Sequence, residues 1–198
     1  ARLAVSEDRL DGFKELGMDP DLETEEAISR SSVVIDCTPS GVGHKNKEKY
    51  YHKFSDKVKG FLAQGSEEGF GVKYARGIND SILTNGDHQF VQIVSCNTHN
   101  ISCITNALVF NEFGPGNLEE GRFVCVRRAN DTSQTGSFIP APVVGSHSDE
   151  QFGSHHAKDA YALFTTLGYD LNIFSSAMKV NSQYASSEMK ESKTVSKM

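Results

Sequence analysis

Cys96 is the residue whose type and position best suit covalent chemistry in this sequence. It follows the apolar run Phe90–Ser95, which predicts a buried central strand, and precedes Thr98–Phe113, whose apolar spacing predicts a helix. A thiol at the start of a helix lies near the positive end of the dipole and near free backbone N–H groups, and both favour the thiolate. The neighbouring amides and the side chains of Asn97 and Thr98 are suited to hold a developing oxyanion.

The alternative for any of the four cysteines is a buried structural role, which suits the other three better: Cys37, Cys103 and Cys125. Four cysteines without a CxxC pair do not make a disulfide scaffold. We therefore expect reduced thiols and a cytoplasmic protein.

The pair His155 and His156 is a second candidate group, because histidines at the start of a helix serve as acid–base groups or bind phosphate. Arg127 and Arg128 end a predicted strand, where a guanidinium suits a phosphate. The alternative for the histidines is that both are merely exposed to solvent, and the alternative for the arginines is a solvated strand end. A zinc site that includes His147 is not favoured, because no His or Cys pair has the usual ligand spacing.

Alternating strands and helices up to Ser95 predict an α/β fold with a parallel sheet, and the strands after Gly121 predict a second, α+β layer. The predicted strands are 1–5, 32–37 (a buried one), 60–63, 71–75, 90–95, 122–127 and 169–180. The predicted helices are 6–16, 21–28, 45–54, 80–83, 98–113 and 156–167. The polar tail 181–198 is predicted to be disordered.

Three loops follow predicted parallel strands, where open α/β sheets bind ligands: 36–41, 64–66 and 95–98. Each loop taken alone is more typical of an ordinary turn between a strand and a helix than of a ligand site.

The composition is that of a globular protein, with 37% hydrophobic residues in 198. Lys and Arg total 20 and Asp and Glu total 26, which gives a net charge of 20 − 26 = −6. This acidic balance argues against a nucleic-acid partner. No apolar run is long enough for a membrane span, and the first residues lack the apolar core of a signal peptide.

Five motifs in order resemble the archaeal-type glyceraldehyde-3-phosphate dehydrogenases. They are DCTPSGVGHKN at 36–46, AQG at 63–65, SCNT at 95–98, VRR at 126–128 with Asp131, and SHH at 154–156. The resemblance runs from residue 1 to about Tyr184. It implies a partial Rossmann-type nucleotide-binding domain over 1–95, followed by a partial α+β catalytic domain with a mixed sheet over 96–180.

The same resemblance implies a phosphorylating dehydrogenase that uses NAD or NADP and acts on glyceraldehyde 3-phosphate and inorganic phosphate. Cys96 resembles the nucleophile that forms a thiohemiacetal. The residues that resemble substrate contacts are Ser95, Asn97, His155 and His156. The residues that resemble cofactor contacts are Gly65, Ser66 and Arg128. A homotetramer is also implied.

Departures from the family pattern keep two alternatives open. The sequence has no G-x-G-x-x-G motif, and the resemblance ends near Tyr184, as expected of a fragment. His99-Asn100 replaces the family's more usual Thr-Gly, and Ala157-Lys158 replaces its usual Gly-Pro. One alternative is a relative that acts on another aldehyde, such as a semialdehyde dehydrogenase. The other is a non-catalytic fragment that acts only by association.

We predict that Cys96 is the most reactive of the four thiols, because a helix start stabilises the thiolate. Iodoacetamide at neutral pH, followed by peptide mapping, should label Cys96 first. Preferential labelling of Cys37 or Cys125 would contradict this assignment.

Overall fold

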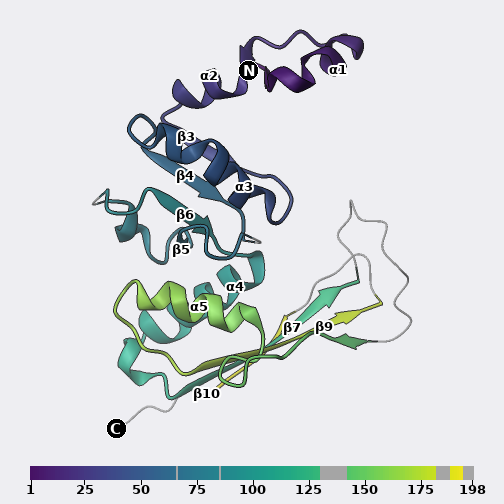
Figure 1. Ribbon diagram of the computed structural model, residues 1–198. Coiled ribbons are helices and arrows are strands. Elements are labelled where there is room, and N and C mark those ends of the chain that lie inside the picture. The colour runs from purple at the N-terminus through teal and green to yellow at the C-terminus, as the bar shows by residue number, and fades with distance from the viewer. Residues whose placement is uncertain (66, 85, 130–141, 182–187, 194–198) are drawn as a thin grey trace. The chain divides into compact units, whose positions relative to one another are not determined.

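The protein is described by a computed structural model that covers all residues except 66, 85, 130–141, 182–187 and 194–198 (Figure 1). The chain divides into two compact units. Unit 1 comprises Ala1–Val72 and Ser81–Ile93, and unit 2 comprises Lys73–Asp80 and Val94–Met198. None of the described helices is long and apolar enough to cross a membrane.

A parallel sheet forms the centre of unit 1. The strand β4 (Gly60–Ala63) pairs in parallel with β3 (Val33–Asp36) on one side and β6 (Phe90–Ile93) on the other. The strand β5 (Val72–Tyr74) completes the order β3-β4-β6-β5. The apolar run of β6 therefore forms the interior strand that its sequence predicts.

The prediction that the strand at 32–37 is buried is wrong for one of its faces. On β3, Val33 is 49% exposed and Ile35 is 62% exposed. Only one edge of β3 pairs with another strand of the described chain. Apolar β-branched residues favour the extended conformation of a strand. Whether such a strand is buried depends on which other elements cover it.

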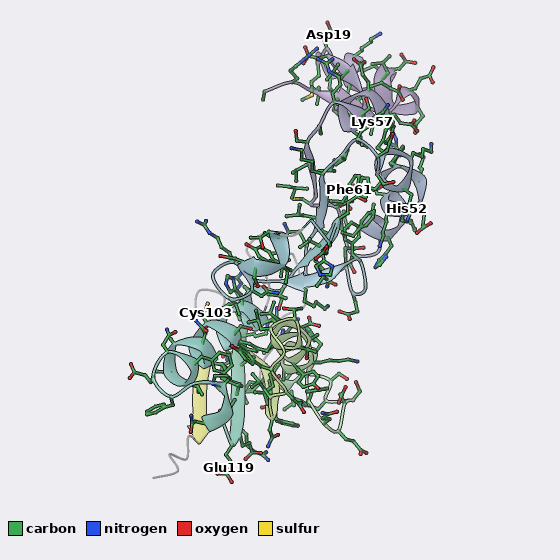
Figure 2. The ribbon with its side chains drawn as sticks, turned by 90° about the vertical axis from the view of Figure 1, so that its left-hand side faces the viewer. Asp19, His52, Lys57, Phe61, Cys103 and Glu119 are labelled. Carbon is green, nitrogen blue, oxygen red and sulfur yellow. The ribbon has the colours of Figure 1, made fainter. Side chains whose placement is uncertain are left out.

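Unit 1 also contains short helices and one further strand pair. They are β1 (Ala4–Val5), η1 (Glu7–Arg9), α1 (Leu10–Glu15), β2 (Leu22–Glu23), α2 (Thr24–Ser29), α3 (Val42–Lys49) and η2 (Tyr51–Phe54). The core is aromatic: the ring of Phe61 (Figure 2) stacks against Tyr51 at 4.8 Å and Phe90 at 5.0 Å between ring centroids.

Unit 2 has a mixed sheet, so the predicted α/β class, with a parallel sheet followed by a mixed one, is confirmed. The long strand β7 (Glu120–Arg128) runs parallel to β9 (Ile173–Val180). The antiparallel strands β10 (Glu188–Lys193) and β8 (Val143–Val144) complete the order β10-β7-β9-β8. The expectation of a disordered tail does not hold for β10, because backbone pairing with β7 needs no apolar side chains.

Two helices of unit 2 lie side by side against this sheet (Figure 1). They are α4 (Cys96–Thr105), which continues into the π-helical turn η4 (Asn106–Phe110), and α5 (His155–Thr165). Two short 3-10 turns, η3 (Asp80–Leu83) and η5 (Pro115–Asn117), complete the chain. The core between helices and sheet includes Ile101, Phe123, Phe164 and Ile173.

The start of α5 is anchored to β9. The Ser175 hydroxyl accepts a hydrogen bond from the Ala157 N–H at 3.0 Å and bonds the Ser154 hydroxyl at 2.7 Å. The chain enters the helix through Gly153, whose φ is +70°. A Cβ at Gly153 would clash with the Ser175 carbonyl oxygen, so both the conformation and the space require glycine.

We predict that Gly153→Ala destabilises the protein by about 3 kcal/mol or more, because left-handed strain adds to a backbone clash. Gly168 is the matched control, since its φ is +79° and nothing lies within 4 Å of its Cβ position. Gly168→Ala should cost only about 1 to 2 kcal/mol. Urea unfolding measures both, and equal losses would show that the close approach to β9 is unimportant.

Candidate active site

The first turn of α4 carries the candidate nucleophile. Ser95 is its N-cap residue, with an extended backbone, and its hydroxyl accepts a hydrogen bond from the Thr98 N–H at 3.3 Å. Cys96 is therefore the first helical residue, two positions earlier than the predicted helix start, and it is exposed. Its Sγ lies 3.9 Å from Oδ1 of Asn97.

His156 joins the two residues on either side of Cys96. Its Nδ1 lies 3.4 Å from the Ser95 hydroxyl, and its Nε2 lies 3.3 Å from Nδ2 of Asn97. The side chain is only 2% exposed, on the face of α5 that meets α4. The structure thus brings together Ser95, Asn97 and His156, three residues that the sequence places in two separate motifs.

The two adjacent histidines have different environments. His155 is exposed, and its ring lies 3.9 Å, centroid to centroid, from that of His156. Burial lowers the pKa of His156 to about 3, and the nearby His155 and Arg127 add to the effect. His156 is therefore neutral at physiological pH, and both of its ring nitrogens have partners.

Further buried polar contacts hold α5 in place, and no sequence motif predicts them. Nζ of Lys73 lies 3.0 Å from Asp159, one turn beyond His156, and both side chains are less than a tenth exposed. Asn79, fully buried, donates from Nδ2 to the Lys73 carbonyl and to the Thr166 hydroxyl. Only the tertiary structure pairs Lys73 with Asp159 and Asn79 with Thr166, because the partners in each pair lie more than 80 positions apart.

The candidate cofactor contacts are divided between the units. Arg128 ends β7 in unit 2, whereas Gly65 follows β4 in unit 1. Gln92, a fully buried residue of β6, donates to the Gly65 carbonyl at 3.2 Å and accepts from the Gly69 N–H at 3.2 Å, which fixes this loop. Ser66 lies outside the described residues.

The N-terminus of α3 is occupied by a side chain of the same unit. The buried carboxylate of Glu67 accepts hydrogen bonds from the Gly41 N–H and, at 3.0 Å, from the His44 N–H. A dinucleotide pyrophosphate requires such N–H groups to be open. The described residues of unit 1 therefore do not provide a pyrophosphate cradle at this helix.

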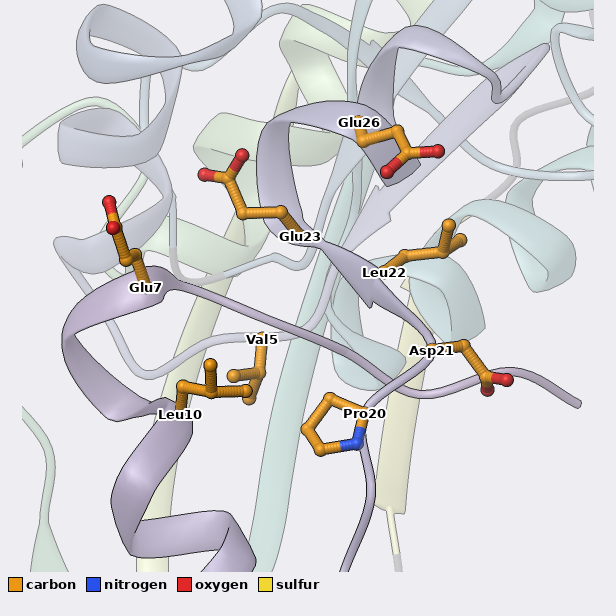
Figure 3. A pocket seen from close by; sticks show the side chains of 8 residues that line it. All are labelled: Val5, Glu7, Leu10, Pro20, Asp21, Leu22, Glu23 and Glu26. Atoms are coloured by element: carbon orange, nitrogen blue, oxygen red, sulfur yellow. The ribbon is translucent and has the colours of Figure 1, made fainter.

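His147 and a cavity in unit 1 are two further features, and neither is part of the candidate site. His147 accepts a hydrogen bond from the Ala177 N–H at 3.1 Å, and the described ranges hold no cluster of three or more potential metal ligands. A cavity of about 460 Å³ in unit 1 (Figure 3) has apolar walls and carboxylates at its rim. None of the predicted site residues lines it.

The low pKa of His156 predicts a pH-dependent stability. The unfolded chain binds this proton near pH 6.5 and the folded chain near pH 3, so the unfolded state takes up more protons between these values. Stability from this group is complete above about pH 6.5 and is lost as the pH falls towards 3. Between pH 7 and pH 5 we expect a loss of roughly 1 to 2 kcal/mol.

Urea unfolding of the protein and of His156→Gln at both pH values measures this contribution. The variant should lose that part of the pH dependence, whereas His52→Gln, the same change at an exposed histidine, should retain it. Equal pH dependence in all three proteins would show that His156 titrates normally in the fold.

The known proteins to which the chain is similar carry the name of the family that these motifs resemble. The chain is 32% identical over 161 residues to the glyceraldehyde-3-phosphate dehydrogenase of Pyrobaculum arsenaticum, which covers 77% of the chain and 42% of that protein. It is 31% identical over 181 residues to the enzyme of that name from Halobacterium salinarum, with 88% of the chain and 48% of the relative covered. The protein of that name from Methanopyrus kandleri is 31% identical over 190 residues, or 90% of the chain and 49% of the relative.

The chain spans about half the length of the curated relatives it matches. No protein-family model matches it. The similarity covers both units, from the parallel sheet of unit 1 to the histidine pair of unit 2. Over most of its own length, this chain is a relative of the archaeal glyceraldehyde-3-phosphate dehydrogenases.

Proposed function

We propose that this chain carries the nucleophile and the substrate-binding residues of a phosphorylating glyceraldehyde-3-phosphate dehydrogenase. The observation that supports it best is the turn Ser95–Asn97, where an exposed thiol begins a helix and a buried histidine contacts both neighbours of that thiol. This arrangement holds a nucleophile in one place with its sulfur open to solvent, as covalent catalysis requires.

The chemistry assigned to Cys96 is addition to an aldehyde. The thiolate attacks the aldehyde carbon of glyceraldehyde 3-phosphate, a carbon–sulfur bond forms, and the carbonyl oxygen becomes an alkoxide that takes up a proton. The backbone N–H groups at the start of α4 favour negative charge at this point. Oxidation to a thioester requires a hydride acceptor, which a nicotinamide dinucleotide supplies in this family, and phosphate then releases the acyl group.

The roles of the other residues follow from the resemblance and from their placement. Ser95, Asn97, His155 and His156 are proposed to contact the substrate, and Gly65, Ser66 and Arg128 the cofactor, NAD or NADP. We also propose a homotetramer, and a cytoplasmic location that suits four cysteines that form no disulfide.

Cofactor binding is the step that the described residues do not support by themselves. Glu67 closes the start of α3, and the sequence has no G-x-G-x-x-G motif. We therefore expect the 198-residue chain to bind the substrate aldehyde without turning it over at an appreciable rate.

Glyceraldehyde 3-phosphate should slow the alkylation of Cys96 by iodoacetamide, because the thiohemiacetal occupies the sulfur. Cys103 on the same helix (Figure 2) is the internal control and should keep its rate, since it is exposed and outside the proposed site. Formation of NADH or NADPH with added phosphate should stay near the background of Cys96→Ala.

One result would contradict the nucleophile assignment, and another would contradict the expectation that the chain does not turn the substrate over. Unchanged labelling of Cys96 at saturating aldehyde phosphate would remove the nucleophile assignment. Turnover within a factor of about ten of ordinary enzymes, absent from Cys96→Ala, would support the family activity but overturn the expectation that the cofactor is poorly held.

A further inference from the structure

Cys96 has a histidine one turn further along its own helix. His99 follows it by three positions within α4, and this spacing places two Cβ atoms about 5 to 6 Å apart on one helix face. Side chains of a helix lean towards its N-terminus, which directs His99 to the turn that Cys96 begins rather than to Cys103. The His99 N–H donates to the Ser95 carbonyl at 2.8 Å, so this turn is helical from its first residue.

The ring of His99 is oriented by a backbone carbonyl. Its Nε2 lies 3.1 Å from the carbonyl oxygen of Arg76, which belongs to segment 73–80 of the same unit. A carbonyl oxygen only accepts hydrogen bonds, so the neutral ring carries its proton on Nε2 and keeps a lone pair on Nδ1. Within the part of the chain that the structure describes, Nδ1 has no hydrogen-bond partner. His99 is thus in the tautomer that accepts a proton at Nδ1.

An activated nucleophile needs three parts, namely a thiol, a base near it and a group that orients the base. The Arg76 carbonyl is the third part, and it also favours a protonated ring, because a charged donor makes the stronger hydrogen bond. The Cys96 sulfur is exposed and lies 3.9 Å from Oδ1 of Asn97, which is a weak contact. Rotation about the Cα–Cβ bond of Cys96 therefore costs little and brings the sulfur to the base, since such hydrogen bonds are often long before substrate binds.

The two histidines of α5 are less suited to this task. Both ring nitrogens of His156 have partners, and its pKa of about 3 makes it a weak base at neutral pH. His155 is exposed, begins a different helix and has its ring against that of His156. His99, by contrast, has a fixed tautomer and lies on the same helix as the thiol.

We propose that His99 is the general base for Cys96 and accepts the thiol proton on Nδ1. The S–H bond breaks as an N–H bond forms, which leaves a thiolate beside an imidazolium whose Nε2–H donates to the Arg76 carbonyl. The start of α4 favours the thiolate and opposes a lone imidazolium, so the two charges form as a pair. The inference rests on the proposed role of Cys96. His99 stands where the family usually has threonine, so the base is a feature of this chain.

The elements next to the start of α4 carry further charged and titratable side chains. They are Arg76 in segment 73–80, Cys103 on α4, Arg127 on β7, and His155 and His156 on α5. Lys73 and Asp159 pair with each other at 3.0 Å, so their charges largely cancel. The two arginines favour a thiolate and oppose an imidazolium, which again favours formation of the two charges as a pair. Cys103 and His155 are the competing partners that the test must separate.

The pH dependence of Cys96 alkylation by iodoacetamide tests the base. His99→Gln keeps a donor for the Arg76 carbonyl but is no base, and His99→Thr introduces the residue usual in the family. At pH 6 both variants should label Cys96 about tenfold more slowly than the unsubstituted chain, because the imidazolium no longer stabilises the thiolate. At pH 10, where the thiol ionises without help, all rates should agree within about twofold. Cys37, exposed in unit 1, is the internal reference, and His52→Gln is the matched control.

Four results would overturn the assignment. Equal losses at pH 6 and pH 10 would show that His99 only supports the helix, and unchanged rates at both would show that it does not act on the thiol. A larger loss at Cys103 than at Cys96 would give the base the wrong partner. The pH-dependent loss in His155→Gln, with none in His99→Gln, would transfer the role to His155.

NMR of the histidine rings gives the reciprocal measurement, because a thiolate must favour the imidazolium as much as the imidazolium favours the thiolate. At the pH where half of Cys96 is ionised, the ratio of protonated to neutral His99 should be several-fold higher in the unsubstituted chain than in Cys96→Ser. Equal ratios would contradict the proposal, and this readout decides if the His99 variants do not fold.

These outcomes are separable from the proposed function, because neither readout requires an aldehyde, phosphate or dinucleotide. Coupled ionisation of Cys96 and His99 without substrate protection would retain the base and remove the dehydrogenase assignment. Substrate protection of Cys96 without coupled ionisation would retain the nucleophile and remove the base.

Discussion

The burial of one neutral imidazole between two helices is the constraint on which the candidate site depends. An uncharged histidine in a protein interior needs partners for both ring nitrogens, and His156 finds them in Ser95 and Asn97. This requirement fixes α5 against the first turn of α4 and leaves Cys96 at the exposed end of that turn. The candidate nucleophile is therefore held by its two neighbours in the chain, while its own sulfur stays open.

The rest of unit 2 supports this contact by holding α5 at both ends. Ser175 and the close approach of Gly153 fix its start, and Asn79 reaches the Thr166 hydroxyl just past its end. The buried pair Lys73–Asp159 adds a contact whose net stabilisation is small, because desolvation offsets the attraction. Losing either partner would leave a buried charge, so the pair favours one placement of α5 over others.

The helices α3 and α4, each of which follows a strand of the parallel sheet, use their N-termini in opposite ways. The start of α3 is closed by the carboxylate of Glu67, which neutralises the positive end of the helix and fixes the loop after β4. The start of α4 has a serine cap and an open thiol. The same electrostatic preference for negative charge thus stabilises the fold in unit 1 and is available for chemistry in unit 2.

The sequence alone determined the class of fold, most of the strands and the motifs around Cys96, because apolar spacing and turn residues act over a few neighbouring positions. In the sequence the histidine pair lies far from the cysteine, and no local pattern predicts that His156 contacts Asn97. Tertiary structure decided that contact, the pairing of Lys73 with Asp159, the exposure of β3 and the strand at Glu188–Lys193. Each depends on which distant segment covers a residue or completes its hydrogen bonds, and burial and pairing between distant segments are properties of the folded chain.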